Sequence, residues 1–317
     1  MGKNKVFLHT KNLCAGYRHG AGKNILLENV SVSLLAGTLT CFMGPNGIGK
    51  STLIRTLAGL QPTLGGALTN VGSKKMALVL TDKISSTNMT VYDLVSYGRY
   101  PYVRWGISFS KDDHRLIAQA ISEVQIESLA DKRLEGLSDG QLQLAMIARA
   151  LAQETPIILL DEPTAHLDLN NRVKIMKLLQ RLAHEKEKAI LVATHELDLA
   201  LQLADTIWLA TPDKKIITGM PEDLVLDNSF DNIFQFKGFD LKTGKIQHKP
   251  FRSQQIKLIG AGHQLLWTKN AFEREGYLIS DEGDTVEIIS ETASWKYQGN
   301  SFSSLQSLME KISVDSV

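Results

Sequence analysis

The residues that most clearly carry chemistry run from Gly44 to Ser51. They read Gly-Pro-Asn-Gly-Ile-Gly-Lys-Ser, which matches the phosphate-binding P-loop pattern G-x-x-x-x-G-K-[ST]. Glycines let backbone N–H groups close around a triphosphate. Lys50 brings a positive charge to the β- and γ-phosphates, and the Ser51 hydroxyl is a ligand for Mg²⁺.

The surroundings of this pattern support a nucleotide site. An apolar stretch at residues 39–43 leads into the loop and a helical pattern leaves it. Because this strand–loop–helix context is what the pattern requires, a chance glycine-rich turn is a poor alternative. We therefore predict that the chain binds ATP with Mg²⁺ through Gly44, Pro45, Asn46, Gly47, Gly49, Lys50, Ser51 and Thr52.

Two carboxylates follow an apolar strand further along the chain. Residues 157–163 read Ile-Ile-Leu-Leu-Asp-Glu-Pro, so four apolar residues end in Asp161 and Glu162. Open α/β sheets bind ligands at the carboxyl edge of their strands, where this pair is expected. We predict that Asp161 orients the hydration shell of Mg²⁺ and that Glu162 polarises the water attacking the γ-phosphate. An acidic turn is a common alternative in isolation, but the upstream P-loop argues against it.

A third segment precedes an amphipathic helix and comprises Leu137, Ser138, Asp139, Gly140 and Gln141. Ser-x-x-Gln is a capping-box pattern, so one interpretation is simply a well-capped helix start. The same geometry offers free N–H groups and a serine hydroxyl, which could hold a γ-phosphate. The two interpretations are compatible.

Together these motifs make the chain similar to the ATP-binding subunit of an ABC transporter. The signature sequence of that family is Leu-Ser-Gly-Gly-Gln, and in this chain Asp139 replaces the first glycine. The resemblance implies that Tyr17 stacks on adenine and that His195, in Ala-Thr-His-Glu, is the switch histidine contacting the γ-phosphate. The run Ala-His-Leu-Asp, ending at Asp168, resembles the D-loop, which crosses to the partner subunit.

Within that family the chain most resembles importers of iron–siderophore complexes, haem and vitamin B12. Residues 90–101 and 194–205 carry this likeness, which covers residues 1 to about 248. The resemblance implies a dimer with a second copy, each ATP lying between one P-loop and the other copy's signature helix. It also implies a polytopic permease, an indirect partnership with a substrate-binding protein, and a peripheral location at the cytoplasmic face of the inner or plasma membrane.

One position departs from the family pattern. The Q-loop glutamine, a Mg²⁺-site residue that relays nucleotide state to the membrane subunit, is expected at about Thr81, but residues 81–83 read Thr-Asp-Lys. Asp82 could replace the oxygen ligand. Either the coupling is built differently here, or the alignment is shifted by a residue or two.

Strand and helix patterns alternate along the chain, and these elements must position the residues described above. Residues 6–14 and 25–35 have strand patterns, and residues 67–71 and 76–80 predict a further strand pair. Residues 90–152 are mostly helical in pattern. The apolar runs at 157–160 and 190–193 predict parallel strands covered on both faces, joined by a helix at about 171–186.

The fold class predicted from these patterns is α/β. We expect a P-loop NTPase core of the ABC type over residues 1–248, with a mixed sheet and a helical subdomain at about 85–152. Residues 249–317 alternate strand and helix patterns and carry core-like apolar residues, so we expect a small α+β domain of regulatory or dimer-stabilising role.

Composition excludes several classes of function. A net charge of +1 gives no electrostatic footprint for nucleic acid. We expect no signal peptide, and no apolar run approaches the roughly 18 to 20 residues that cross a bilayer.

Two alternatives to an importer subunit are a soluble ABC ATPase of DNA repair or translation and a nucleotide-dependent regulator. The first typically has a coiled-coil insertion or two fused cassettes, and the sequence shows neither.

Overall fold

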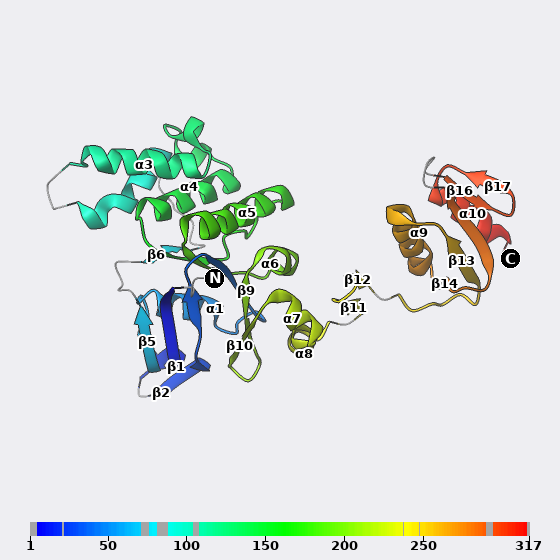
Figure 1. Ribbon diagram of the computed structural model, residues 1–317, viewed down its shortest axis with the longest axis horizontal. Coiled ribbons are helices and arrows are strands. Elements are labelled where there is room, and N and C mark those ends of the chain that lie inside the picture. Colours follow the sequence, from blue (N-terminus) through cyan, green and yellow to red (C-terminus); the bar gives the residue numbers. More distant parts are fainter. Residues whose placement is uncertain are drawn as a thin grey trace. The chain divides into compact units, whose positions relative to one another are not determined.

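The computed structural model describes residues 5–20, 22–70, 76–80, 88–103, 108–236, 238–246, 248–289 and 294–315. The chain folds into two compact units, Met1–Gln235 and Phe236–Val317 (Figure 1). This division lies earlier than the boundary near residue 248 that the sequence patterns suggest.

A mixed sheet forms the centre of the first unit. Among the described residues it has six strands in the order β10-β9-β4-β8-β7-β6. All neighbours are parallel except β10, which is antiparallel to β9. The strands are β4 (Thr38–Met43), β6 (Met76–Val79), β7 (Ile157–Asp161), β8 (Ala189–Ala193), β9 (Thr206–Ala210) and β10 (Ile216–Gly219). Every residue of β7 and β8 is buried, as their unbroken apolar runs predict.

A second, antiparallel sheet packs beside it, with β1 paired to β2, β3 and β5. These strands are β1 (Val6–His19), β2 (Gly22–Val30), β3 (Ser33–Leu35) and β5 (Gly65–Asn70). The expectation that the strands at 67–71 and 76–80 pair with each other is wrong. Instead β5 pairs with β1, whereas β6 joins β7 in the mixed sheet.

Helix α1 (Lys50–Leu57) lies between the two sheets and contacts β1 on one side and β7 and β8 on the other. Its apolar residues Leu53, Ile54 and Leu57 are fully buried in the shared core. Because this face is enclosed on both sides, the start of the helix, where the P-loop ends, is held rigidly against the mixed sheet.

A helical region follows in sequence, comprising α2 (Val91–Ser96), the 3₁₀ helices η2 (Tyr97–Tyr102), η3 (Glu127–Leu129) and η4 (Leu134–Gly136), α3 (Lys111–Glu123) and α4 (Asp139–Ala152). It confirms the helical prediction for this part of the chain. Helices α5 (Leu169–Lys186), α6 (Leu197–Leu203), α7 (Pro221–Leu226) and α8 (Ser229–Phe234) complete the unit.

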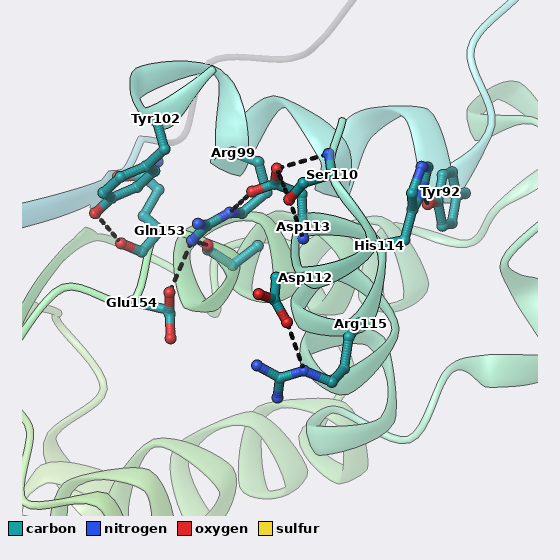
Figure 2. A network of polar contacts seen from close by, with 11 residues as sticks. Tyr92, Arg99, Tyr102, Ser110, Asp112, Asp113, His114, Arg115, Gln153 and Glu154 are labelled. Atoms are coloured by element: carbon teal, nitrogen blue, oxygen red, sulfur yellow. Dashed lines mark hydrogen bonds and ion pairs between the residues drawn. The ribbon is translucent and has the colours of Figure 1, made fainter. Parts of the chain in front are cut away.

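The buried guanidinium of Arg99 ties the helical region together (Figure 2). Its Nε donates to Asp113 Oδ1 at 2.9 Å, at the start of α3. Its Nη1 donates to the Ala152 carbonyl and to Glu154 Oε2, both at 2.9 Å, at the end of α4. Hydrogen bonds from Ser110, and more weakly from Arg99, lower the pKa of Asp113 to about 2. The network therefore fixes the C-terminal end of α4, whose N-terminal end carries the signature sequence.

The second unit contains a hairpin of β11 (Phe239–Asp240) and β12 (Lys245–Ile246) and a five-stranded sheet of order β14-β13-β15-β16-β17. The sheet strands are β13 (Gln255–Ile259), β14 (Leu278–Ile279), β15 (Asp284–Ile289), β16 (Ser294–Tyr297) and β17 (Asn300–Phe302). Helices α9 (Gly262–Arg274) and α10 (Leu305–Asp315) accompany them, and Ile256, Phe272, Val286 and Leu308 lie in a core of its own. Among the described residues of the whole chain, no helix is long and apolar enough to span a membrane.

Candidate functional site

The P-loop connects β4 to α1 and has the backbone that its glycines permit. Gly47 and Gly49 adopt φ angles of 77° and 108°, in the region that favours glycine. The Lys50 ammonium is folded into the loop, where Nζ donates to the Gly44 carbonyl at 2.9 Å and to the Pro45 carbonyl at 3.3 Å. Burial lowers the pKa of Lys50, whereas the charges of the acidic pair on β7 oppose this shift. The loop thus holds its positive charge at its centre.

Asp161 ends β7 beside the first turn of α1. It is 4% exposed, and burial raises its pKa, although a hydrogen bond with the Ser51 side chain acts in the opposite direction. Its Oδ1 is buried and has no hydrogen-bond partner among the described residues. A buried carboxylate oxygen without a partner is costly unless it meets a donor or a cation.

The side chains of Ser51 and Asp161 both carry oxygen atoms and could serve as ligands of Mg²⁺. The described residues contain no group of three or more His, Cys, Asp or Glu side chains that could hold a metal ion by themselves. Mg²⁺ takes few protein ligands, and completes its shell with water and substrate phosphates. The hydroxyl of Ser51 and the free oxygen of Asp161 are therefore the type and number of ligands expected for a nucleotide-bound Mg²⁺.

Glu162 and His195 come from neighbouring strands and meet at the same edge of the sheet. Glu162 has a positive φ of 47° and its N–H donates to the Ala193 carbonyl at 2.9 Å, which joins the ends of β7 and β8. His195 Nδ1 lies 3.3 Å from Glu162 Oε2. Both side chains are partly exposed, at 54% for the histidine and 30% for the glutamate. The pair can thus reach a ligand in solution while each side chain orients the other.

A second ion pair supports this arrangement, and sequence reasoning missed it. Arg172 on α5 lies 2.9 Å from the Glu196 carboxylate and also donates its Nε to the Leu167 carbonyl at 2.6 Å. Glu196 Oε1 in turn lies 3.8 Å from His195 Nε2. These contacts therefore link the segment ending at Asp168, helix α5 and His195. The only sequence signal was the glutamate directly after His195, which has no meaning until Arg172 is placed beside it.

Tyr17 lies beside the P-loop helix. Its hydroxyl is 2.8 Å from Thr52 Oγ1, and the side chain is 43% exposed. The structure therefore brings the predicted adenine-stacking residue to the phosphate site while part of its ring stays accessible. Stacking on adenine itself remains a prediction.

The signature segment starts α4 with the predicted capping box. Ser138 Oγ accepts from the Gln141 N–H at 3.3 Å, and Gln141 Oε1 accepts from the Ser138 N–H at 3.1 Å. Ser138 and Asp139 are exposed, whereas Gly140 is buried. This end of the helix is consequently open to a ligand or a partner.

The signature segment and the D-loop are packed against each other. A Cβ added at Gly140 would lie 3.0 Å from Asn171 Cγ. Asn171 is bound to Asp168, the N-cap of α5, through Nδ2 to Oδ2 at 2.7 Å and its N–H to Oδ1 at 3.0 Å. Gly140 therefore permits a close approach of α4 to α5. Thr81 and Asp82, where the Q-loop is expected, fall within residues 81–87, which lie outside the described part of the chain.

Two families match this chain. Residues 27–165, which include the P-loop, the signature and the acidic pair, match the family described as ABC transporter. Residues 253–313, within the second compact unit, match the iron ABC transporter C-terminal domain. Residues 253–313, which contain none of the ATP-site motifs, thus match a separate domain family.

Individual proteins show the same likeness. The chain is 36% identical to an uncharacterized ABC transporter ATP-binding protein of Methanocaldococcus jannaschii, over 76% of this chain and 89% of that protein. It is 35% identical to a petrobactin import ATP-binding protein of Bacillus anthracis, over 73% and 87%. A ferric enterobactin transport ATP-binding protein of Escherichia coli is 34% identical, over 68% and 83%.

Solved structures extend the likeness to the fold. An inward-facing structure of an ABC transporter assigned to the metal-chelate type has a TM-score of 0.67 and 27% identity, covering 73% of this chain and 90% of that one. A dimeric structure of a bacterial ABC transporter cassette has a TM-score of 0.59 and 25% identity, covering 68% and 99%.

Proposed function

Because the chain belongs to the family of ABC transporter ATP-binding proteins, we propose that it powers the import of an iron–siderophore complex. The chain is an ATPase of this family. The observation that carries the mechanism is the meeting of the P-loop, Asp161, Glu162 and His195 at one sheet edge.

The proposed cargo is a ferric siderophore rather than haem or cobalamin. Support comes from two independent parts of the chain. The ATP-binding core resembles proteins named for petrobactin import and ferric enterobactin transport. Residues 253–313 match a domain named for iron ABC transporters.

ATP binding uses the P-loop in this proposal. Its backbone N–H groups and Lys50 surround the phosphates, and the ammonium exchanges its present carbonyl acceptors for phosphate oxygens. Ser51 and Asp161 would hold Mg²⁺, which supplies charge neutralisation at the phosphates. Tyr17, already beside Thr52, offers the exposed part of its ring to adenine.

Hydrolysis uses the pair at the neighbouring strand ends. Glu162 accepts a proton from the attacking water, since its carboxylate is partly exposed and next to the phosphate site. His195, 3.3 Å away, orients this carboxylate and reaches the γ-phosphate. Arg172 and Glu196 keep the histidine in place, so they are positioning residues.

The working unit is proposed to be a pair of these chains with a membrane permease. The exposed N-terminus of α4, with Ser138 and Asp139, would close over the ATP of the partner copy. Asp168 would cross the same interface. Asp82 is proposed to replace the Q-loop glutamine. The pair would lie at the cytoplasmic face of the membrane, served indirectly by a substrate-binding protein and without a nucleic-acid partner.

Reconstitution tests this function. The chain, its permease and the substrate-binding protein are placed in proteoliposomes, and uptake of a radioactive ferric siderophore is measured with ATP supplied on the side of the ATPase. We expect uptake that requires ATP and that stops with Lys50→Ala. ATP hydrolysis that no permease stimulates, with no uptake, would instead support a nucleotide-dependent regulator.

A further inference from the structure

The second compact unit, Phe236–Val317, contains a cavity of its own. Its volume is about 870 Å³, and its walls come mainly from α9, α10 and the segment around Arg252 (Figure 1 shows both helices). Small-molecule sites occupy about 300 to 1,000 Å³. The cavity is therefore large enough for a small organic ligand, and no function assigned so far uses it.

Arg252 is built into the wall of this cavity. Its Nε donates to the Glu275 carbonyl at 2.8 Å, and its guanidinium lies 4.8 Å from the centre of the Tyr277 ring. The backbone N–H groups of Phe251 and Arg252 both donate to the Gly276 carbonyl, at 3.1 and 3.0 Å. Arg252 is thus anchored by Nε and by its backbone, and within the described residues its two terminal nitrogens keep their donors for a ligand.

Gly276 makes this anchor possible. It adopts a φ of 84°, and a Cβ at this position would lie 2.4 Å from the Phe251 ring. A side chain would therefore displace Phe251 and the arginine that follows it. The local geometry depends on a glycine at the turn after α9.

Among the described residues, no carboxylate pairs with the guanidinium of Arg252. Two carboxylates also line the cavity, but each has a neighbour on its own segment. Glu310 Oε1 accepts from Gln306 Nε2 at 3.0 Å, and Glu275 Oε1 lies 3.9 Å from Arg274 Nε. In the part of the chain that the structure describes, Arg252 forms no ion pair. An oriented guanidinium without a carboxylate partner is suited to a bidentate anion.

Besides the positive charge of Arg252, the cavity has an apolar face, which helices α9 and α10 supply. Trp267 on α9 lines the cavity and is 65% exposed, a large exposed fraction for an indole. Leu305 and Met309 on α10 line it as well. An aromatic ring stacked on the indole would remove this apolar surface from water.

We propose that this cavity binds a small aromatic carboxylate, whose carboxylate pairs with Arg252 and whose ring lies against Trp267. The unit is then a ligand-binding module with its own site, separate from the ATP site. This binding does not depend on which cargo the transporter carries.

The test uses the full chain and 1-naphthoate as the probe. Saturation-transfer difference NMR titrations give its affinity, with 1-naphthol as the ring without the carboxylate and inorganic phosphate as the anion without the ring. We expect 1-naphthoate to bind more tightly than either, and Arg252→Gln to weaken it about tenfold or more. Lys296→Gln, which removes an exposed charge of the same unit away from the cavity, should have no effect.

Two further variants keep the proposal falsifiable if Arg252→Gln does not fold. Arg252→Lys keeps the charge without the fork and should weaken binding, and Trp267→Ala changes an exposed side chain and should do the same. Unchanged affinity in Arg252→Lys and Trp267→Ala would overturn the proposal. Equal affinity for 1-naphthol would show a merely apolar patch, and equal affinity for phosphate would show a simple anion site. Either result contradicts the proposed ligand class.

Discussion

Replacing Glu162 by glutamine separates catalysis from nucleotide binding. The amide keeps the shape of the side chain, and the N–H bond to the Ala193 carbonyl involves only backbone, so the fold should not change. The change removes a negative charge that acts on Lys50 of the P-loop, and this charge would repel the phosphates of ATP. ATP should therefore bind at least as tightly as to the wild type.

We expect Glu162→Gln to lower the rate of ATP hydrolysis. A positioned general base contributes about 10²- to 10⁴-fold, which is roughly 3 to 5 kcal/mol of activation free energy. Because Glu162 directly follows β7, lies 3.3 Å from His195 and is partly open to solvent, we expect a loss in this range. Release of inorganic phosphate measures the rate. Size-exclusion chromatography with ATP and Mg²⁺ should show an accumulated dimer, since the closed state can no longer hydrolyse its nucleotide.

A matched control is Glu185→Gln. This glutamate is 60% exposed and lies 4.0 Å from Arg181 in the last turn of α5, away from the carboxyl edge of the sheet. Its replacement should leave turnover near the wild-type value. If Glu162→Gln retained turnover within about tenfold of the wild type, the general-base role would be refuted.

Other predictions test binding, stability and domain structure. Lys50→Ala should abolish measurable ATP binding in equilibrium dialysis, because the loop loses its central charge; unchanged affinity would contradict this. Since the folded pKa of Asp113 is lowered from 3.8 to about 2, its charge stabilises the fold above pH 3.8, and this contribution is lost as the pH falls toward 2. Thermal unfolding should accordingly show wild type more stable than Asp113→Asn at pH 6 and the difference shrinking below pH 4; a difference independent of pH would argue against the linkage. A chain ending at residue 248 should fold and hydrolyse ATP, because every predicted catalytic residue precedes that point; an insoluble product would mean that the remaining residues cover part of the core.

Local sequence determined the parts of the site that a single segment can build. The P-loop, the capping box at Ser138 and the acidic pair after β7 depend on backbone geometry over a few residues. Glycines at positive φ, a side chain that caps its own helix and an apolar run that ends in carboxylates can all be recognised without knowing what lies nearby. The two buried parallel strands β7 and β8 were predictable for the same reason.

Only the tertiary structure decided which segments meet. The order β4-β8-β7 in the sheet places His195 next to Glu162, and the packing of α5 brings Arg172 to Glu196. The sequence patterns also could not assign β5 and β6 to different sheets, because strand propensity does not encode a pairing partner. The cavity around Arg252 is likewise invisible in the sequence. Arg252, helix α9 with Trp267, and helix α10 are separated along the chain. Only the packing of the second unit places them around one cavity.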